Sequence, residues 1–164
     1  MAILNCSIVW PGARRPMAFE PKNPHYRDFI KQVLKAQPFM VALGVMASRI
    51  EPGEIELSVA IRPDHLQHGG VVHGGVLVAM ADNAGGAAAA SLLPEGQAVV
   101  TAEYRISFLA PAAGQKLIAR GTVLKPGRTL IHTRSDVIAV ADGRETLVAT
   151  GLGTMVPFAM TRQR

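Results

Sequence analysis

The stretch from Val76 to Leu92 constrains the fold of this chain more than any other part of the sequence. It predicts a helix with apolar or small residues on every side, and Asp82 is its only charge. A helix that is apolar all round must be enclosed by the rest of the protein. Gly85 and Gly86 in its middle each cost roughly 1 kcal/mol relative to alanine. We expect the close approach of another backbone to offset this cost.

A membrane-spanning helix is the alternative for this part of the chain. The weakly charged region from Gly69 to Pro94 has about the length needed to cross a bilayer. However, it is rich in glycine and alanine, and Asp82 in its middle would be expensive in lipid. We therefore expect a buried helix and no membrane partner. Residues 1–10 lack the basic start of a signal peptide, which favours a cytoplasmic location.

Composition narrows the class of protein further. The 164 residues suit one ordinary domain, and 49% hydrophobic with 18% charged residues is too apolar for a disordered chain. The single cysteine, Cys6, excludes an internal disulfide framework and a cysteine-based zinc site. The net charge of +5 favours anionic partners. No aromatic-basic pattern of a nucleic-acid module is present, so nucleic acid is not expected among them.

The rest of the chain predicts one helix and a set of strands. Residues 1–24, with four prolines, predict a poorly ordered leader, and residues 25–160 predict a single domain. A helix is expected from Tyr26 to the stop at Pro38, followed by an apolar turn from Phe39 to Gly44. Strands are expected at 45–50, 54–61, 102–108, 117–123, 129–140 and 145–156. Short turns imply antiparallel neighbours, so we predict an α+β fold in which a curved antiparallel sheet wraps one long central helix.

Asp82 is the first candidate for chemistry. A carboxylate in an otherwise apolar helix costs free energy unless it is satisfied or used. Just before the helix, His73, Gly74 and Gly75 form a turn in which a substrate can approach the backbone closely. The first-turn N–H groups are unpaired and lie at the positive end of the helix dipole, so they could stabilise the oxyanion of an acyl intermediate.

The spacing of these groups predicts an oligomer. Asp82 follows Gly74 by eight residues, which is about 12 Å along a helix. The N–H and the carboxylate of one chain cannot then reach the same acyl carbon. If both act, they come from different subunits, which predicts a dimer with sites at its interface.

Three weaker signals accompany Asp82 and the Gly74 N–H. The Gln67 amide could donate to a substrate carbonyl, or lie in solvent. His65, His68 and His73 form a loose string, but Asp64 has no positioning partner, so no metal site is expected. The turn from Lys125 to Arg128 could hold a phosphate, or be a solvated hairpin tip.

At this point the sequence resembles a known family. The run HGGVVHGGVLVAMADNAGGAAAA is similar to the His-Gly-Gly-x6-Asp motif of hotdog-fold acyl-CoA thioesterases, in the phenylacetate-pathway (PaaI-like) and thioesterase-superfamily branch. The segments TAEYRISFLAPAAGQKLIARGTVLKPGRTLIHTRSDV and GRETLVATGLGTMVPF resemble the same branch. Of the two His-Gly-Gly triplets, only that at His73 has an acid nine residues on.

The resemblance implies a set of residue roles in acyl-CoA hydrolysis. By position Asp82 matches the catalytic acid, as general base or nucleophile, and Gly74 the oxyanion donor. Gln67 falls beside the thioester carbonyl, and Thr101 near a hydroxyl residue that orients the water. His73 belongs to the motif and is expected at the catalytic end of the site. The expected substrate contacts are Gly75, Asn83, Lys125 and Arg128, the last two along coenzyme A.

The resemblance also implies a homodimer, commonly paired into a homotetramer, and a reaction that needs no cofactor besides its substrate. Two alternatives remain open. A hotdog hydroxyacyl-thioester dehydratase would use a histidine fourteen residues before the acid, a spacing that His68 and Asp82 have. A non-catalytic acyl-CoA-binding domain would have no need of the buried charge at Asp82.

Overall fold

The computed structural model describes residues 19–160 of the chain. Residues 1–18, which hold most of the predicted leader, lie outside the described part. The helices are α1 (Tyr26–Lys35), α2 (Pro38–Leu43) and α3 (Gly74–Ala90), with a 3₁₀ turn at Pro63–His65. The strands are β1 (Met46–Glu51), β2 (Glu54–Ala60), β3 (Gln97–Phe108), β4 (Lys116–Pro126), β5 (Ile131–Ala141) and β6 (Arg144–Ala159).

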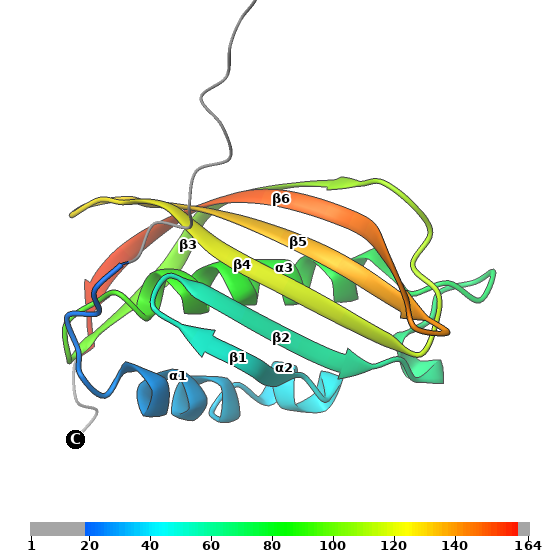
Figure 1. Cartoon of the computed structure of the whole chain (residues 1–164), viewed down its shortest axis with the longest axis horizontal. Helices are drawn as coiled ribbons and strands as arrows, with labels where there is room; N and C mark the ends of the chain where they lie inside the picture. The colour runs from blue at the N-terminus through cyan, green and yellow to red at the C-terminus, as the bar shows by residue number, and fades with distance from the viewer. Residues whose placement is uncertain (1–18, 161–164) are drawn as a thin grey trace, which may run out of the picture.

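The strands form one antiparallel sheet around a central helix. Their order is β1-β2-β4-β5-β6-β3, and every pairing is antiparallel. Figure 1 shows the curved sheet lying across α3, with α1 and α2 beside β1. This confirms the predicted α+β hotdog architecture. Because β3 is placed at the edge next to β6, its outer side has no strand partner within residues 19–160.

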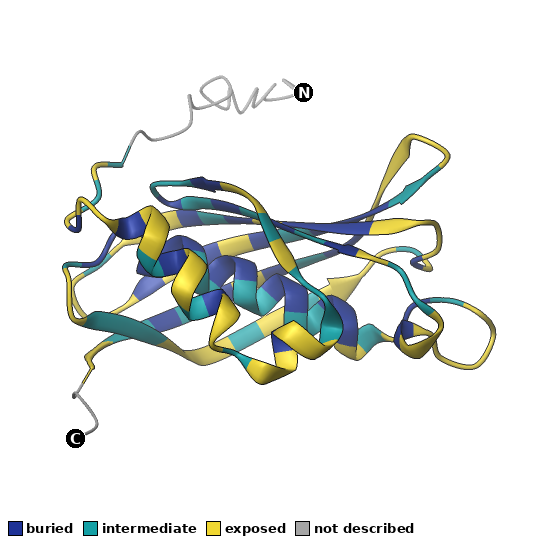
Figure 2. Cartoon of the chain, turned by 90° about the horizontal axis from the view of Figure 1, so that it is seen from below, coloured by how far each residue is buried: buried dark blue, intermediate teal, exposed yellow. Residues whose placement is uncertain are grey.

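Apolar residues at the expected spacing bury the inner faces of these elements. Tyr26, Ile30 and Leu34 of α1 are buried, as are Ile55, Leu57 and Val59 of β2. Burial of each large aliphatic side chain contributes about 1.5–3 kcal/mol. Figure 2 shows α1 with one buried and one exposed face, while α3 is buried or half-buried along most of its length. No helix in residues 19–160 is long and apolar enough to cross a membrane.

The predicted close approach of a backbone to α3 occurs at its middle. A Cβ atom added to Gly121 of β4 would collide with the backbone of Ala84. A Cβ on Gly85 would lie 2.9 Å from Thr133 Oγ1 and 3.0 Å from Ser135 Oγ. Only at Gly86 is the expectation wrong, because a Cβ there would meet nothing nearer than Val99 Cγ2 at 3.9 Å.

The segment after α1 also differs from expectation. Residues 38–43 form the short helix α2 where a turn was predicted. Pro38 ends α1, as expected, but it also opens α2, because proline suits the first position of a helix. Gly44, with a φ of +76°, ends α2 in the left-handed conformation that glycine adopts most readily.

Candidate active site

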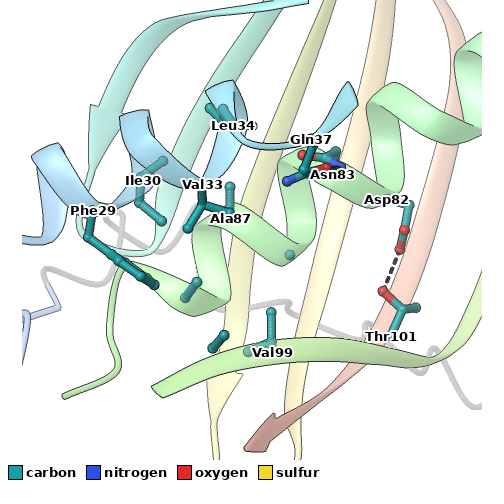
Figure 3. A pocket seen from close by; sticks show the side chains of 13 residues that line it. Phe29, Ile30, Val33, Leu34, Gln37, Asp82, Asn83, Ala87, Val99 and Thr101 are labelled. Carbon is teal, nitrogen blue, oxygen red and sulfur yellow. Dashed lines mark hydrogen bonds between the residues drawn. The ribbon is translucent and has the colours of Figure 1, made fainter. Parts of the chain in front are cut away.

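Asp82 is held by a hydroxyl from the neighbouring strand. It lies half-buried in the middle of α3, and Thr101 Oγ1 of β3 donates a hydrogen bond of 2.8 Å to Asp82 Oδ1 (Figure 3). No other hydrogen bond to this carboxylate is present in residues 19–160. The hydroxyl therefore fixes one oxygen and leaves Oδ2 available to accept a proton or to attack.

A cavity of about 260 Å³ opens beside Asp82, between α1, α3 and β3. Its polar side is formed by Asp82, Thr101 and an amide pair in which Asn83 Nδ2 donates to Gln37 Oε1 at 2.7 Å. Its remaining lining is apolar or small and consists of Phe29, Ile30, Val33, Leu34, Gly86, Ala87, Ala90, Ala98 and Val99. Figure 3 shows Asp82 and Phe29 at opposite ends of this lining. This lining suits a substrate whose apolar group fills the cavity while its reactive atom lies beside Asp82.

Gln37 is a lining residue that the sequence did not reveal. It belongs to the linker between α1 and α2, far from α3 in sequence. A single polar residue before a proline carries no signal of a site, so only the fold, which places this linker beside α3, brings Gln37 to Asn83.

The N-terminus of α3 presents one free backbone donor. The His73 side chain accepts the Gly75 N–H through Nδ1 at 2.9 Å, and the His73 carbonyl accepts the Val76 N–H at 3.0 Å. The Gly74 N–H has no acceptor in the described residues. In this arrangement the His73 side chain caps the helix by accepting the Gly75 N–H. The Gly74 N–H stays available as the donor that an oxyanion would need.

Gly74 lies in a second hollow, of about 550 Å³, which is mostly apolar. Gln67 lines it too, so the structure brings together the two predicted carbonyl-binding groups. The loop is held in place by backbone hydrogen bonds, from His73 N to His65 O at 2.9 Å and from Val72 N to Ala112 O at 2.8 Å. The Phe108 ring covers Gly74, since a Cβ there would lie 3.3 Å from Phe108 Cζ.

The acid and the donor thus belong to separate hollows of one chain. Asp82 and Thr101 line the first, and Gly74 and Gln67 line the second. The rise of α3 separates Asp82 from Gly74 by about 12 Å along the helix axis. A single chain therefore keeps the acid and the donor in two separate hollows.

Other predicted residues lie away from both hollows. Lys125 and Arg128 are exposed at the hairpin between β4 and β5, and His68 is exposed in the loop before α3. No group of three or more histidine, cysteine, aspartate or glutamate side chains in residues 19–160 is arranged to hold a metal ion.

Tyr104 lies half-buried on β3 near Asp82. Burial raises the pKa of its phenol above the usual value of 10.0, and the charges of Asp82 and Asp136 raise this pKa further, while the nearby Ser135 hydroxyl partly offsets them. The ring fits because Gly151 and Gly153 of β6 have no side chain where it lies.

Comparison with known proteins gives one family. The model of the thioesterase superfamily matches residues 69–145. Human acyl-coenzyme A thioesterase 13 is 30% identical over 131 residues, which are 78% of this chain and 91% of that protein. The crystal structure of a thioesterase family protein from Silicibacter pomeroyi is 34% identical with a TM-score of 0.80, covering 82% of this chain and 98% of that one.

A more distant structure shares the fold alone. The E. coli PaaI protein from the phenylacetic acid degradation operon is 22% identical, with a TM-score of 0.75, and the match covers 85% of this chain and 98% of that one.

The capping role of His73 can be measured as stability. Replacement of an N-cap residue by alanine costs about 1 kcal/mol, whereas asparagine caps well. We expect His73→Ala to lower the free energy of unfolding in urea by this amount, His73→Asn to retain it, and His68→Ala, in the exposed loop, to leave it unchanged. Equal stability of His73→Ala and wild type would show that the ring does not stabilise the helix.

Proposed function

Because the chain belongs to the thioesterase superfamily, we propose that it hydrolyses acyl-coenzyme A thioesters to a free acid and coenzyme A. The observation that carries this proposal is the Asp82 carboxylate, held on one oxygen by Thr101 and open on the other, at the polar end of an apolar cavity. The cavity would take the acyl group, which brings its carbonyl carbon next to Asp82. The reaction needs water and substrate alone, so we propose no further cofactor.

The proposed chemistry divides between the groups of the two hollows. The Gly74 N–H, assisted by the Gln67 amide, hydrogen-bonds to the thioester carbonyl oxygen and stabilises its charge in the tetrahedral intermediate. Asp82 takes a proton from water as the water oxygen bonds to the carbonyl carbon. The carbon–sulfur bond then breaks, and the coenzyme A thiolate is protonated. Attack by Asp82 itself, giving an anhydride that water hydrolyses, uses the same free oxygen.

A second copy of the chain would complete each site. Strand β3 offers a long outer edge without a partner in the described residues, and such edges are templates for strand pairing. Val100, Phe108 and the adjacent Leu109 are more than half exposed on and beside it. We propose that two β3 strands pair about a two-fold axis, so that Asp82 of one subunit works with Gly74 of the other. Pairing of such dimers into tetramers remains an expectation.

Coenzyme A would extend from the site over basic surface. Lys125 and Arg128, both exposed, are the proposed phosphate contacts, since ammonium and guanidinium groups bind phosphate oxygens well. The dehydratase alternative has less support, because His68 is exposed and lines neither hollow.

Loss of the Asp82 charge tests the proposal directly. Thiol release is measured with phenylacetyl-, benzoyl-, hexanoyl- and palmitoyl-CoA. Asp82→Asn should lower kcat by about 10²–10⁴-fold, the usual contribution of a general base. Asp28→Asn, the same change at a side chain that is 74% exposed on α1, should keep wild-type turnover. Turnover that survives Asp82→Asn would refute the role of Asp82, and no wild-type turnover on any thioester would refute the proposed function.

A proline at Gly74 tests the backbone donor. Gly74 is the first residue of α3, where proline fits the helix but lacks the N–H group. We expect Gly74→Pro to reduce kcat by about 10²–10³-fold, the effect of removing one oxyanion donor. Gly74→Ala adds a Cβ against Phe108 as well but keeps the N–H, so it should retain far more activity. Equal losses in the two variants would mean that the added atoms, and not the missing donor, are responsible.

Subunit mixing tests whether the sites are shared. In a heterodimer of Asp82→Asn and Gly74→Pro subunits, one composite site is fully intact and the other carries both changes. After random exchange of subunits, the mixture should recover about a quarter of wild-type activity. If each site were built within one chain, both sites of the heterodimer would be defective and the mixture would show no recovery.

A further inference from the structure

The two adjacent glycines in α3 are there for different reasons. Gly85 is buried, and a Cβ on it would press against the Thr133 and Ser135 hydroxyls of β5 at 2.9 and 3.0 Å. At Gly86 a Cβ would lie at ordinary van der Waals distance, 3.9 Å, from Val99 Cγ2 and near nothing else. Packing within this chain therefore explains why residue 85 is glycine. It does not explain why residue 86 is glycine, since alanine would stabilise the helix interior there.

The position of Gly86 beside the cavity indicates that this glycine serves ligand binding and not folding. It follows Asp82 by four residues, so the two lie on the same face of α3, about 6 Å apart along the axis. Both line the 260 Å³ cavity, and Val99 of β3 is the nearest neighbour across from Gly86. Phe29 of α1 lies at the end of the cavity away from Asp82 (Figure 3). The missing side chain therefore widens the cavity one turn beyond the carboxylate.

We infer that Gly86 is a specificity-determining residue, retained as glycine so that the bulk of the acyl group fits between α3 and Val99. This inference rests on the proposed thioesterase function and adds the class of acyl group to it. An acyl group whose carbonyl lies at Asp82 reaches Gly86 only if it extends several carbons or carries a ring. The preferred acyl group therefore extends several carbons beyond its carbonyl or carries a ring.

The test compares substrates that do and do not reach Gly86. The value of kcat/KM is measured for phenylacetyl-CoA, hexanoyl-CoA and acetyl-CoA with wild type, Gly86→Ala and Gly85→Ala. One added carbon in an apolar pocket changes discrimination by about 10–200-fold. We expect Gly86→Ala to lower the ratios of phenylacetyl-CoA and hexanoyl-CoA to acetyl-CoA by at least about tenfold. Gly85→Ala serves as the matched change outside the cavity.

Stability separates a glycine kept for space from one kept for packing. Gly86→Ala should raise the midpoint of thermal unfolding by about 2–4 °C, because alanine favours the helix. Gly85→Ala should lower it, because the new Cβ meets the two hydroxyls. A lower midpoint or a dissociated oligomer in Gly86→Ala would mean that Gly86 serves packing, and would overturn the inference. Unchanged substrate ratios would overturn it as well.

A binding measurement keeps the inference independent of turnover. Calorimetric titration of phenylacetyl-CoA and acetyl-CoA into Asp82→Asn, with and without Gly86→Ala, reports affinity alone. If wild type hydrolyses no thioester but Gly86→Ala still weakens phenylacetyl-CoA binding at least about tenfold relative to acetyl-CoA, the proposed hydrolysis fails and the cavity assignment stands. Equal weakening of both ligands would overturn the assignment.

Discussion

The close packing of α3 against the sheet is the constraint on which the rest of this structure depends. Small residues on the helix and Gly121 on β4 allow the two backbones to approach at Ala84, and the sheet curves around the helix as a result. A larger side chain at this contact would push the helix away from β4 and β5. Asp82 lies two residues before this contact on the same helix, within hydrogen-bond distance of the Thr101 hydroxyl of β3.

An enclosed helix restricts where its polar groups can act. Most of its circumference is buried, so Asp82 can face only the gap between α1 and β3, where the small cavity lies. Its N-terminus emerges at the other hollow and presents the Gly74 N–H there. Acid and donor are thus rigidly positioned by one helix, yet too far apart to act on one carbon. The proposed dimer would resolve this geometry, since a two-fold axis would bring the acid of one copy to the donor of the other.

Much of the candidate site could be predicted from the sequence because its parts are local. Asp82 stands out as a charge in an apolar helix, and Gly74 as a glycine in the turn just before the expected helix. Both features depend on the one-dimensional pattern and on helix geometry. The pairing of Asn83 with Gln37, the capping of Gly75 by His73 and the bond from Thr101 to Asp82 depend on side-chain positions in space. The periodicity of the sequence contains no such positions.

The sequence by itself determined the fold class, the order of the strands and of helices α1 and α3, and the separation of Asp82 from Gly74, since periodicity and helical rise are properties of the chain alone. Only the tertiary structure decided which strand approaches α3, which linker lines the cavity and why two neighbouring glycines differ. Those outcomes depend on packing between residues distant in sequence, such as Gly121 with Ala84 and Val99 with Gly86. The physical reason is that close packing is decided by atoms meeting in space, which a linear pattern does not specify.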